Sequence, residues 1–231
     1  MKGSEVCDIL KHIGATRLHH ANSVTTSCTF LEQGALLSRG FVEDRGFRQT
    51  AQPSSDEIDK RYGIWHDVFL DHVDIHDRGG RKKGPNKYGP VLFVFDLDIL
   101  LTLPSGSEVR VTKSNPIHWY DKQPDVNRWF QTPEELAKVI GFGDFDKMLV
   151  IRTPSGRLDF PERHARIILD DPQRQMSSGE NAYDHATNRL TTAGAVGKVE
   201  ISIERRVCQG GCVCVQKYAG YSPPGIDTFF G

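Results

Sequence analysis

The sequence has no excess of either charge, and this limits the partners that it can attract from a distance. Lysine and arginine number 29 and aspartate and glutamate number 30 among the 231 residues, so the net charge is −1. A chain this close to neutral has no overall field that would draw it to nucleic acid or to a membrane surface. Any such partner would have to be bound by a local group of basic residues.

Long apolar runs and a secretory leader are also missing. No apolar stretch approaches the roughly 18 residues that a membrane-spanning helix needs, and residues 1–14 are too polar for a secretory signal. These absences favour a cytoplasmic protein without a membrane partner.

Cysteine is scarce, and its number is odd. Five cysteines argue against a closed disulfide framework. Cys208, Cys212 and Cys214 lie close enough in sequence to supply three zinc ligands, with a fourth from Cys7, Cys28 or a distant histidine. The alternative is a set of reduced thiols in a glycine-rich tail, and we assign no metal.

The rest of the composition is that of an ordinary globular protein. Hydrophobic residues make up 38% and charged residues 26% of the chain, while 22 glycines and 12 prolines indicate many loops. No internal repeat and no domain boundary is visible, so we expect a single domain over residues 1–231. Short predicted strands mixed with short helices, without repeated βαβ units, favour the α+β class.

Residues 17–40 are the most informative stretch and predict a strand, a helix and a turn. The strand ends in His19 and His20, Asn22 or Ser23 can cap the helix, and Gly34 suits its C-terminal end. A histidine at the end of a strand beside a helix N-terminus is a plausible contact for a ligand that carries phosphate or ribose. The alternative is an ordinary strand–helix unit with surface histidines.

Further elements follow from periodicity, caps and turn residues. We expect helices within residues 1–16, 55–61, 133–140 and 181–191, and strands within 63–75, 90–103, 107–112, 147–153, 166–169 and 198–207. Residues 41–62 are polar and read as a long loop with one short helix. Loops of this length are uncommon unless they are functional or disordered.

Histidine and aspartate are dense after this loop, which raises the alternative of a metal-dependent nuclease or hydrolase. The residues are His66, Asp67, Asp71, His72, Asp74, His76 and Asp77. If residues 65–77 form a strand, alternation places His66, His72, Asp74 and His76 on one face. The other interpretation is a strand whose polar face is solvated.

A basic segment follows the histidines and could contact phosphates. It contains Arg78, Arg81, Lys82, Lys83 and Lys87, followed by Tyr88. Since only one aromatic residue accompanies these cations, a solvated charged loop is the alternative.

Several segments, in the same order along the chain, resemble those of one family. They are Leu18-His19-His20-Ala21-Asn22, Glu32-Gln33-Gly34-Ala35-Leu36-Leu37, Ile58-Asp59-Lys60-Arg61, Trp65-His66-Asp67-Val68-Phe69, Arg128-Trp129-Phe130, Pro133-Glu134-Glu135-Leu136 and Asp146-Lys147-Met148-Leu149-Val150. Together they resemble the DarT-type ADP-ribosyltransferases of the wider diphtheria-toxin/PARP-like fold. The resemblance covers about residues 17–171 and leaves residues 172–231 as an unassigned extension.

The resemblance implies a split, mixed β-sheet and a toxin-like transferase that uses NAD as its substrate. Its ADP-ribose acceptor would be a base in single-stranded DNA, and a cognate inhibitor protein would be a further partner. His20 and Asn22 would contact the ribose, and Arg48 and Arg61 the pyrophosphate or the reaction centre. The ligand would lie between residues 17–23 and the 41–62 loop.

One departure from the family concerns catalysis. The family has a catalytic glutamate at the head of the strand that matches residues 148–151, whereas this chain has Asp146 and Lys147 there. Either Asp146 takes the catalytic role with a shorter side chain, or the chain is a catalytically silent module that binds NAD or a nucleotide.

Overall fold

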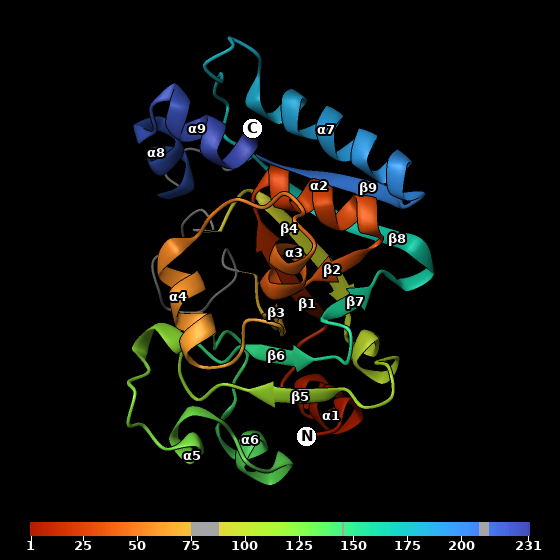
Figure 1. Ribbon diagram of the computed structural model, residues 1–231, viewed down its shortest axis with the longest axis vertical. Helices are drawn as coiled ribbons and strands as arrows, with labels where there is room; N and C mark the ends of the chain where they lie inside the picture. Colours follow the sequence, from red (N-terminus) through yellow and green to blue (C-terminus); the bar gives the residue numbers. More distant parts are fainter. Residues whose placement is uncertain (75–87, 145, 208–212) are drawn as a thin grey trace.

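The chain alternates short helices and short strands and so has the expected α+β class (Figure 1). The computed structural model describes residues 1–74, 88–144, 146–207 and 213–231. The helices are α1 (Gly3–His12), α2 (Val24–Gln33), α3 (Arg39–Asp44), α4 (Pro53–Arg61), α5 (Asp125–Arg128), α6 (Pro133–Val139), α7 (Ala182–Gly197), α8 (Val213–Gly220) and α9 (Pro223–Phe230). The strands are β1 (Arg17–Asn22), β2 (Ala35–Leu37), β3 (Val68–Leu70), β4 (Val91–Asp96), β5 (Glu108–Val111), β6 (Leu149–Arg152), β7 (Arg157–Asp159), β8 (His164–Asp171) and β9 (Glu200–Val207).

The strands form separate sheets, and the two larger ones meet at β1. One sheet has the order β1-β4-β8-β9 and is mixed, because β8 and β9 are parallel and the other pairs antiparallel. A second sheet has the order β3-β6-β5, and β2 pairs with β7. The main chains of His19 and Asp71 connect the two larger sheets through hydrogen bonds of 2.7 and 2.9 Å. Among the described residues, no other backbone pairing joins these two sheets.

Helix α2 covers the four-stranded sheet because its caps and apolar face match that position. The Ser23 side chain accepts a hydrogen bond from the Thr26 N–H, and Gly34 ends the helix in the left-handed conformation at φ 70°. Phe30 packs against Phe93 of β4, which stacks on Phe160. Helix α7 packs on α2, as the upper half of Figure 1 shows.

The C-terminal residues are part of this packing. Strand β9 pairs along the whole length of β8, and Ile226 and Phe230 of α9 are fully buried. The Thr25 hydroxyl of α2 donates to the Gly231 carbonyl at 2.6 Å. Within the described ranges, no helix has the length and apolar character needed to cross a bilayer.

Some expected elements are wrong. The strand expected over residues 63–75 is reduced to Val68–Leu70, because Asp67 turns inward to an arginine and His72 is buried instead of alternating with its neighbours. The strand expected over residues 90–103 ends at Asp96, where a 3₁₀ turn over Leu97–Leu101 begins. Helix α3 occupies part of the expected loop, and helices α8 and α9 were not anticipated.

Candidate functional site

His20 is held in one orientation next to the bridge between the two larger sheets. Its Nδ1 lies 2.7 Å from the Phe69 carbonyl of β3, which can only accept, so Nδ1 carries the proton. Burial, reinforced by the positive charge of Arg39, lowers the pKa of His20 to about 4 against the opposing effect of the Phe69 hydrogen bond. The ring is therefore neutral at pH 7, and Nε2 is a hydrogen-bond acceptor.

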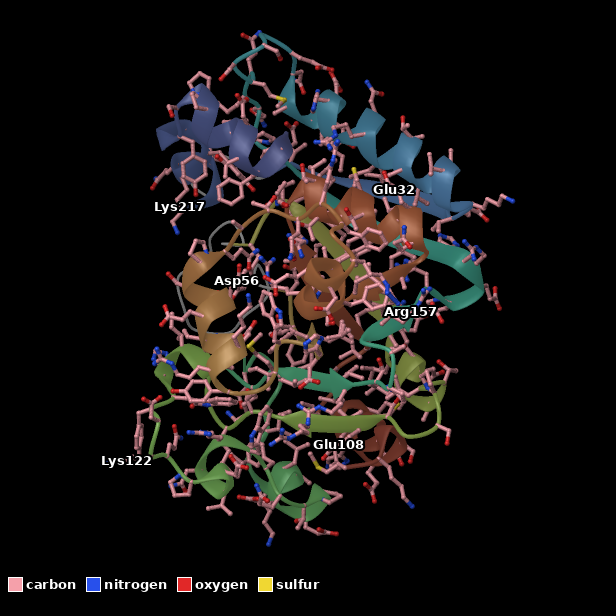
Figure 2. All side chains as sticks on the ribbon, in the orientation of Figure 1. Glu32, Asp56, Glu108, Lys122, Arg157 and Lys217 are labelled. Carbon is pink, nitrogen blue, oxygen red and sulfur yellow. The ribbon has the colours of Figure 1, made fainter. Side chains whose placement is uncertain are left out.

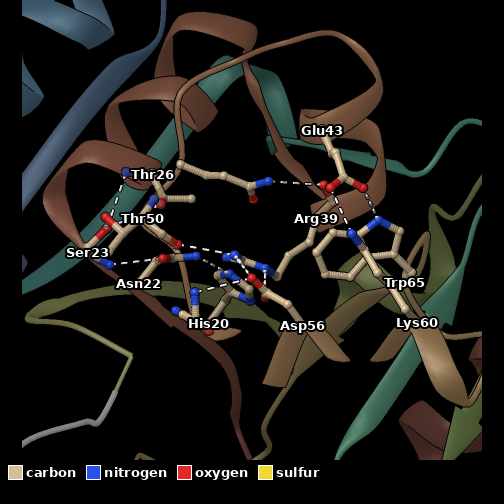
Figure 3. A network of polar contacts seen from close by, with 12 residues as sticks. His20, Asn22, Ser23, Thr26, Arg39, Glu43, Thr50, Asp56, Lys60 and Trp65 are labelled. Carbon is tan, nitrogen blue, oxygen red and sulfur yellow. Dashed lines mark hydrogen bonds and ion pairs between the residues drawn. The ribbon is translucent and has the colours of Figure 1, made fainter. Parts of the chain in front are cut away.

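Asn22 lies on the same face of β1 as His20, and its side-chain amide contacts the His20 ring. Its Nδ2 is 3.4 Å from His20 Nε2, and its Oδ1 accepts from the Ser23 N–H at 2.9 Å. The Ser23 hydroxyl in turn lies 2.6 Å from the Thr50 hydroxyl. Residues 17–23 and 41–62 are thus hydrogen-bonded to each other, as Figure 3 shows.

Arg39, at the start of α3, brings the main positive charge to this region. Its guanidinium forms paired contacts with the Asp56 carboxylate of α4, at 2.5 and 2.8 Å, and donates to the Thr50 carbonyl at 3.1 Å. The Arg39 and Asp56 side chains are 14% and 19% exposed, so water screens the pair only partly. Figure 2 places Asp56 on the side of α4 that faces the centre of the molecule.

Asp59 lies one turn further along α4 and carries a perturbed carboxyl group. Burial raises the pKa of Asp59 to about 7, with a further increase from the negative charges of Asp56 and Asp67 and a decrease from Arg39. Such a carboxyl group can exchange a proton near neutral pH. We call His20, Asn22, Arg39, Asp56 and Asp59 the His20 cluster.

The two arginines predicted from the sequence lie at the outside of this cluster. Arg48 is exposed; its carbonyl accepts from the Thr29 hydroxyl at 2.7 Å, and in the described ranges its guanidinium has no partner. Arg61 is 49% exposed and pairs with Glu57 at 2.8 Å and Asp121 at 3.8 Å. No hydrogen bond links either arginine to His20 or Asn22 among the described residues. Since exposed ion pairs are weak, Arg61 can exchange its partners for a ligand.

Asp146 lies just before β6, and Thr112 fixes its main chain. The Thr112 hydroxyl donates to the Asp146 carbonyl at 3.1 Å and accepts from the Met148 N–H at 2.8 Å. The neighbouring Lys147 directs its ammonium group to Asp144 at 2.8 Å. The cation beside Asp146 is therefore already neutralised.

The residues of the metal-site alternative are separated. His66 is 60% exposed and 3.8 Å from Asp44, whereas His72 is 2% exposed and its Nε2 lies 3.3 Å from the Gly141 carbonyl. The shared strand face expected for them is wrong, because β3 is only three residues long. No group of three metal-ligating side chains occurs among the residues that the structure describes.

The remaining predicted residues of interest fall mostly outside the described ranges. This group consists of His76, Asp77, the basic segment up to Lys87, Cys208 and Cys212. The side chain of Cys214 is likewise not described. Cys7 and Cys28 are buried free thiols. The zinc alternative and the phosphate-binding alternative for these residues stay predictions.

Sequence reasoning missed Arg39, Asp56 and Asp59. The spacing of three between Asp56 and Asp59 is a signal for one helix face, since residues three apart are neighbours on a helix. No sequence signal separates Arg39 from Arg45 or Arg48, because its burial depends on the position of α4.

Comparison with known proteins gives similarity to solved structures. No family model and no curated protein matches the chain. The DarT of Thermus sp. 2.9 in complex with ADP-ribosylated ssDNA is similar at a TM-score of 0.48 and 11% identity, over 83% of this chain and 95% of that one. The same protein in complex with NAD+ is similar at a TM-score of 0.44 and 12% identity, over 82% and 96%. Both of these solved structures are of a DarT.

Proposed function

We propose that the chain binds NAD and transfers or hydrolyses its ADP-ribose. The observation that carries the proposal is the state of His20, whose neutral ring offers Nε2 as an acceptor beside the Asn22 amide. An acceptor and an amide side by side suit the hydroxyl groups of a ribose. These are also the two residues that the sequence resemblance assigns to this role.

The positive charges that could bind the pyrophosphate of a dinucleotide lie outside the His20 cluster. Arg39 is engaged by Asp56, so the cluster itself offers little net positive charge to a phosphate. Arg48 and Arg61 lie outside it and are exposed. We assign the pyrophosphate to these two arginines, since guanidinium groups bind phosphate oxygens through paired hydrogen bonds.

In the proposed reaction the bond between the ribose and nicotinamide breaks, and positive charge develops on the ribose. The bonding electrons leave with nicotinamide, whose ring nitrogen becomes neutral. A carboxylate near the ribose stabilises the developing charge, and we assign this role to Asp146. The acceptor that we propose for transfer is a base in single-stranded DNA, and for hydrolysis it is water. We also propose a cognate inhibitor protein as a further partner.

Calorimetry with NAD tests the proposal. The intact protein should bind NAD, and Arg61→Ala should weaken binding roughly tenfold to a hundredfold, since a hydrogen bond to a charged group contributes about 1.5–3 kcal/mol. Lys60→Ala is a matched control, because Lys60 is the neighbouring cation on α4 and pairs with Glu43. If the intact protein shows no heat of binding with NAD, the proposal is wrong. If it binds NAD without turning it over, the chain is a catalytically silent binding module.

A further inference from the structure

Helix α2 has a row of buried hydroxyl groups on the side that faces the 41–62 segment. The row begins at the N-cap Ser23 and continues with Thr26 and Thr29, each three residues after the one before. Residues three apart are neighbours on a helix, so the hydroxyl groups follow one face. Because buried hydroxyl groups are rarely left without a hydrogen-bond partner, this face needs polar groups opposite it.

These hydroxyl groups hold the main chain of the segment that contains Arg48. The Thr29 hydroxyl donates to the Arg48 carbonyl at 2.7 Å. Two residues further on, the Thr50 N–H donates to the Thr26 hydroxyl oxygen at 2.9 Å, and the hydroxyl groups of Ser23 and Thr50 lie 2.6 Å apart (Figure 3). The main chain on both sides of the Arg48 side chain is therefore fixed to α2.

The Arg48 side chain differs from its main chain, because it is not held. Its guanidinium is exposed and has no hydrogen-bond or ion-pair partner among the described residues. The carbonyl of Thr50, in contrast, accepts from the buried Arg39 at 3.1 Å. A cation that carries no ion pair and extends from a fixed main chain is prepared for an anion, since binding need not first order the loop.

We propose that Thr29 is a positioning residue for the bound dinucleotide. Its hydroxyl holds the Arg48 main chain at the place from which the guanidinium reaches the pyrophosphate. This inference rests on the proposed function, in which Arg48 contacts the pyrophosphate. Thr29 is 4% exposed and acts on the ligand only through Arg48.

Calorimetry with NAD on variants of Thr29 tests the inference. Thr29→Val keeps the shape of the side chain but removes the hydroxyl, and it should weaken NAD binding about threefold to tenfold, a part of the contribution of a hydrogen bond to a charged group. Thr29→Ser keeps the hydroxyl and should bind NAD as the intact protein does. Thr25→Val is the matched control, because the Thr25 hydroxyl on the same helix donates to the Gly231 carbonyl instead.

A combination with Arg48→Ala separates positioning from a general structural role. In the Arg48→Ala background, Thr29→Val should not weaken NAD binding further, because the guanidinium that the hydroxyl positions is gone. A general loss of packing would weaken binding by the same factor in both backgrounds. Equal factors would therefore overturn the inference.

The same measurements distinguish this inference from the proposed function. If the intact protein does not bind NAD, the proposed function fails and this inference fails with it. If the intact protein and Thr29→Val bind NAD equally well, the positioning role is wrong and the proposed function stands. Urea denaturation checks that each variant is folded, and Thr50→Val, which removes the hydroxyl contact with Ser23, replaces Thr29→Val if that variant does not fold. It should show the same dependence on Arg48.

Discussion

At the scale of single residues, His20 and Asp71 are two titratable groups near β1 that differ in whether a hydrogen bond satisfies the side chain. His20 avoids a buried charge by staying neutral, with its proton fixed by the Phe69 carbonyl. Asp71 lies at the bridge to β1, and its Oδ1 is buried without a hydrogen-bond partner in the described ranges. An unpaired buried carboxylate is costly when it is ionised.

Asp146 gives a prediction that depends on the length of one side chain. Aspartate is one methylene shorter than the family's glutamate, and a displacement of about 1 Å can cost on the order of 10²-fold in rate. Asp146→Glu should therefore keep or raise the release of ADP-ribose from NAD, whereas Asp146→Asn should abolish it. The aspartate and asparagine side chains have nearly the same size, so packing does not account for a loss. Equal turnover by the intact protein and Asp146→Asn would exclude this residue from catalysis.

Asp71 gives a prediction about stability and pH. Burial raises the pKa of Asp71 from 3.8 to about 7. Because the folded state then favours the protonated form, the contribution to stability is complete below pH 3.8 and is lost as pH rises to about 7. Asp71→Asn should thus be more stable than the intact protein at pH 8, by about 1–3 kcal/mol, with little difference at pH 4. Urea denaturation at both pH values measures this.

A control for Asp71 is Asp98→Asn, because Asp98 is exposed and pairs with the exposed Lys11. That variant should change little at either pH. If the stability of Asp71→Asn depends on pH in the same way as that of the intact protein, ionisation of the Asp71 carboxylate does not destabilise the fold.

At the scale of elements, an ion pair holds the segment before β3 against the last residue of β6. Arg152 donates from Nε and Nη2 to the two oxygens of Asp67, at 2.9 and 2.8 Å, and from Nη2 to the Gly63 carbonyl at 2.8 Å. The Asp67 side chain is 1% exposed. Asp67, which belongs to the histidine–aspartate segment of the sequence resemblance, therefore fixes the segment before β3 against β6.

Removal of the arginine should be far more costly than removal of an exposed cation. Arg152→Ala leaves the Asp67 carboxylate buried without its partner and should lower the free energy of unfolding by about 2–4 kcal/mol. Lys11→Ala, which breaks an exposed pair with Asp98, should cost less than about 1 kcal/mol. Chemical denaturation of both variants at pH 7 checks this, and equal losses would contradict the structural role of Arg152.

Elements with a local chemical signal were predictable from the sequence. Ser23 and Gly34 fix the ends of α2, and Thr132 with Pro133 fixes the start of α6. The limits of β3 were not predictable, because they depend on Arg152, which is distant in sequence. His20 and Asn22 were named from the strand and from the sequence resemblance, and their contact with a ribose stays a prediction. Arg39 was not named, since only the packing of α3 against α4 makes it a buried partner of Asp56.

At the scale of the whole molecule, the extension over residues 172–231 packs against the part of the fold that the resemblance covers. Strand β9 completes the four-stranded sheet, and α7 packs on α2. The Tyr218 hydroxyl of α8 donates to the Asp170 carboxylate of β8 at 2.8 Å. Residues 172–231 thus stabilise the elements that carry His20.

A chain ending at Pro172 should therefore lose its cooperative fold. Truncation leaves β8 with an unpaired edge and exposes the face of α2 that α7 covers, which is a large loss against a typical total stability of about 5–15 kcal/mol. Near-ultraviolet circular dichroism and a thermal scan of the truncated chain measure this. A cooperative transition close to that of the full chain would show that the extension is dispensable.

The bridge between His19 and Asp71 is a short backbone connection between the two larger sheets. In the described part of the chain, two main-chain hydrogen bonds hold this junction, whereas β8 and β9 are joined along eight residues. The His20 side chain crosses the same junction to the Phe69 carbonyl. A molecule that bound His20 Nε2 would therefore contact a ring whose other nitrogen joins the two sheets.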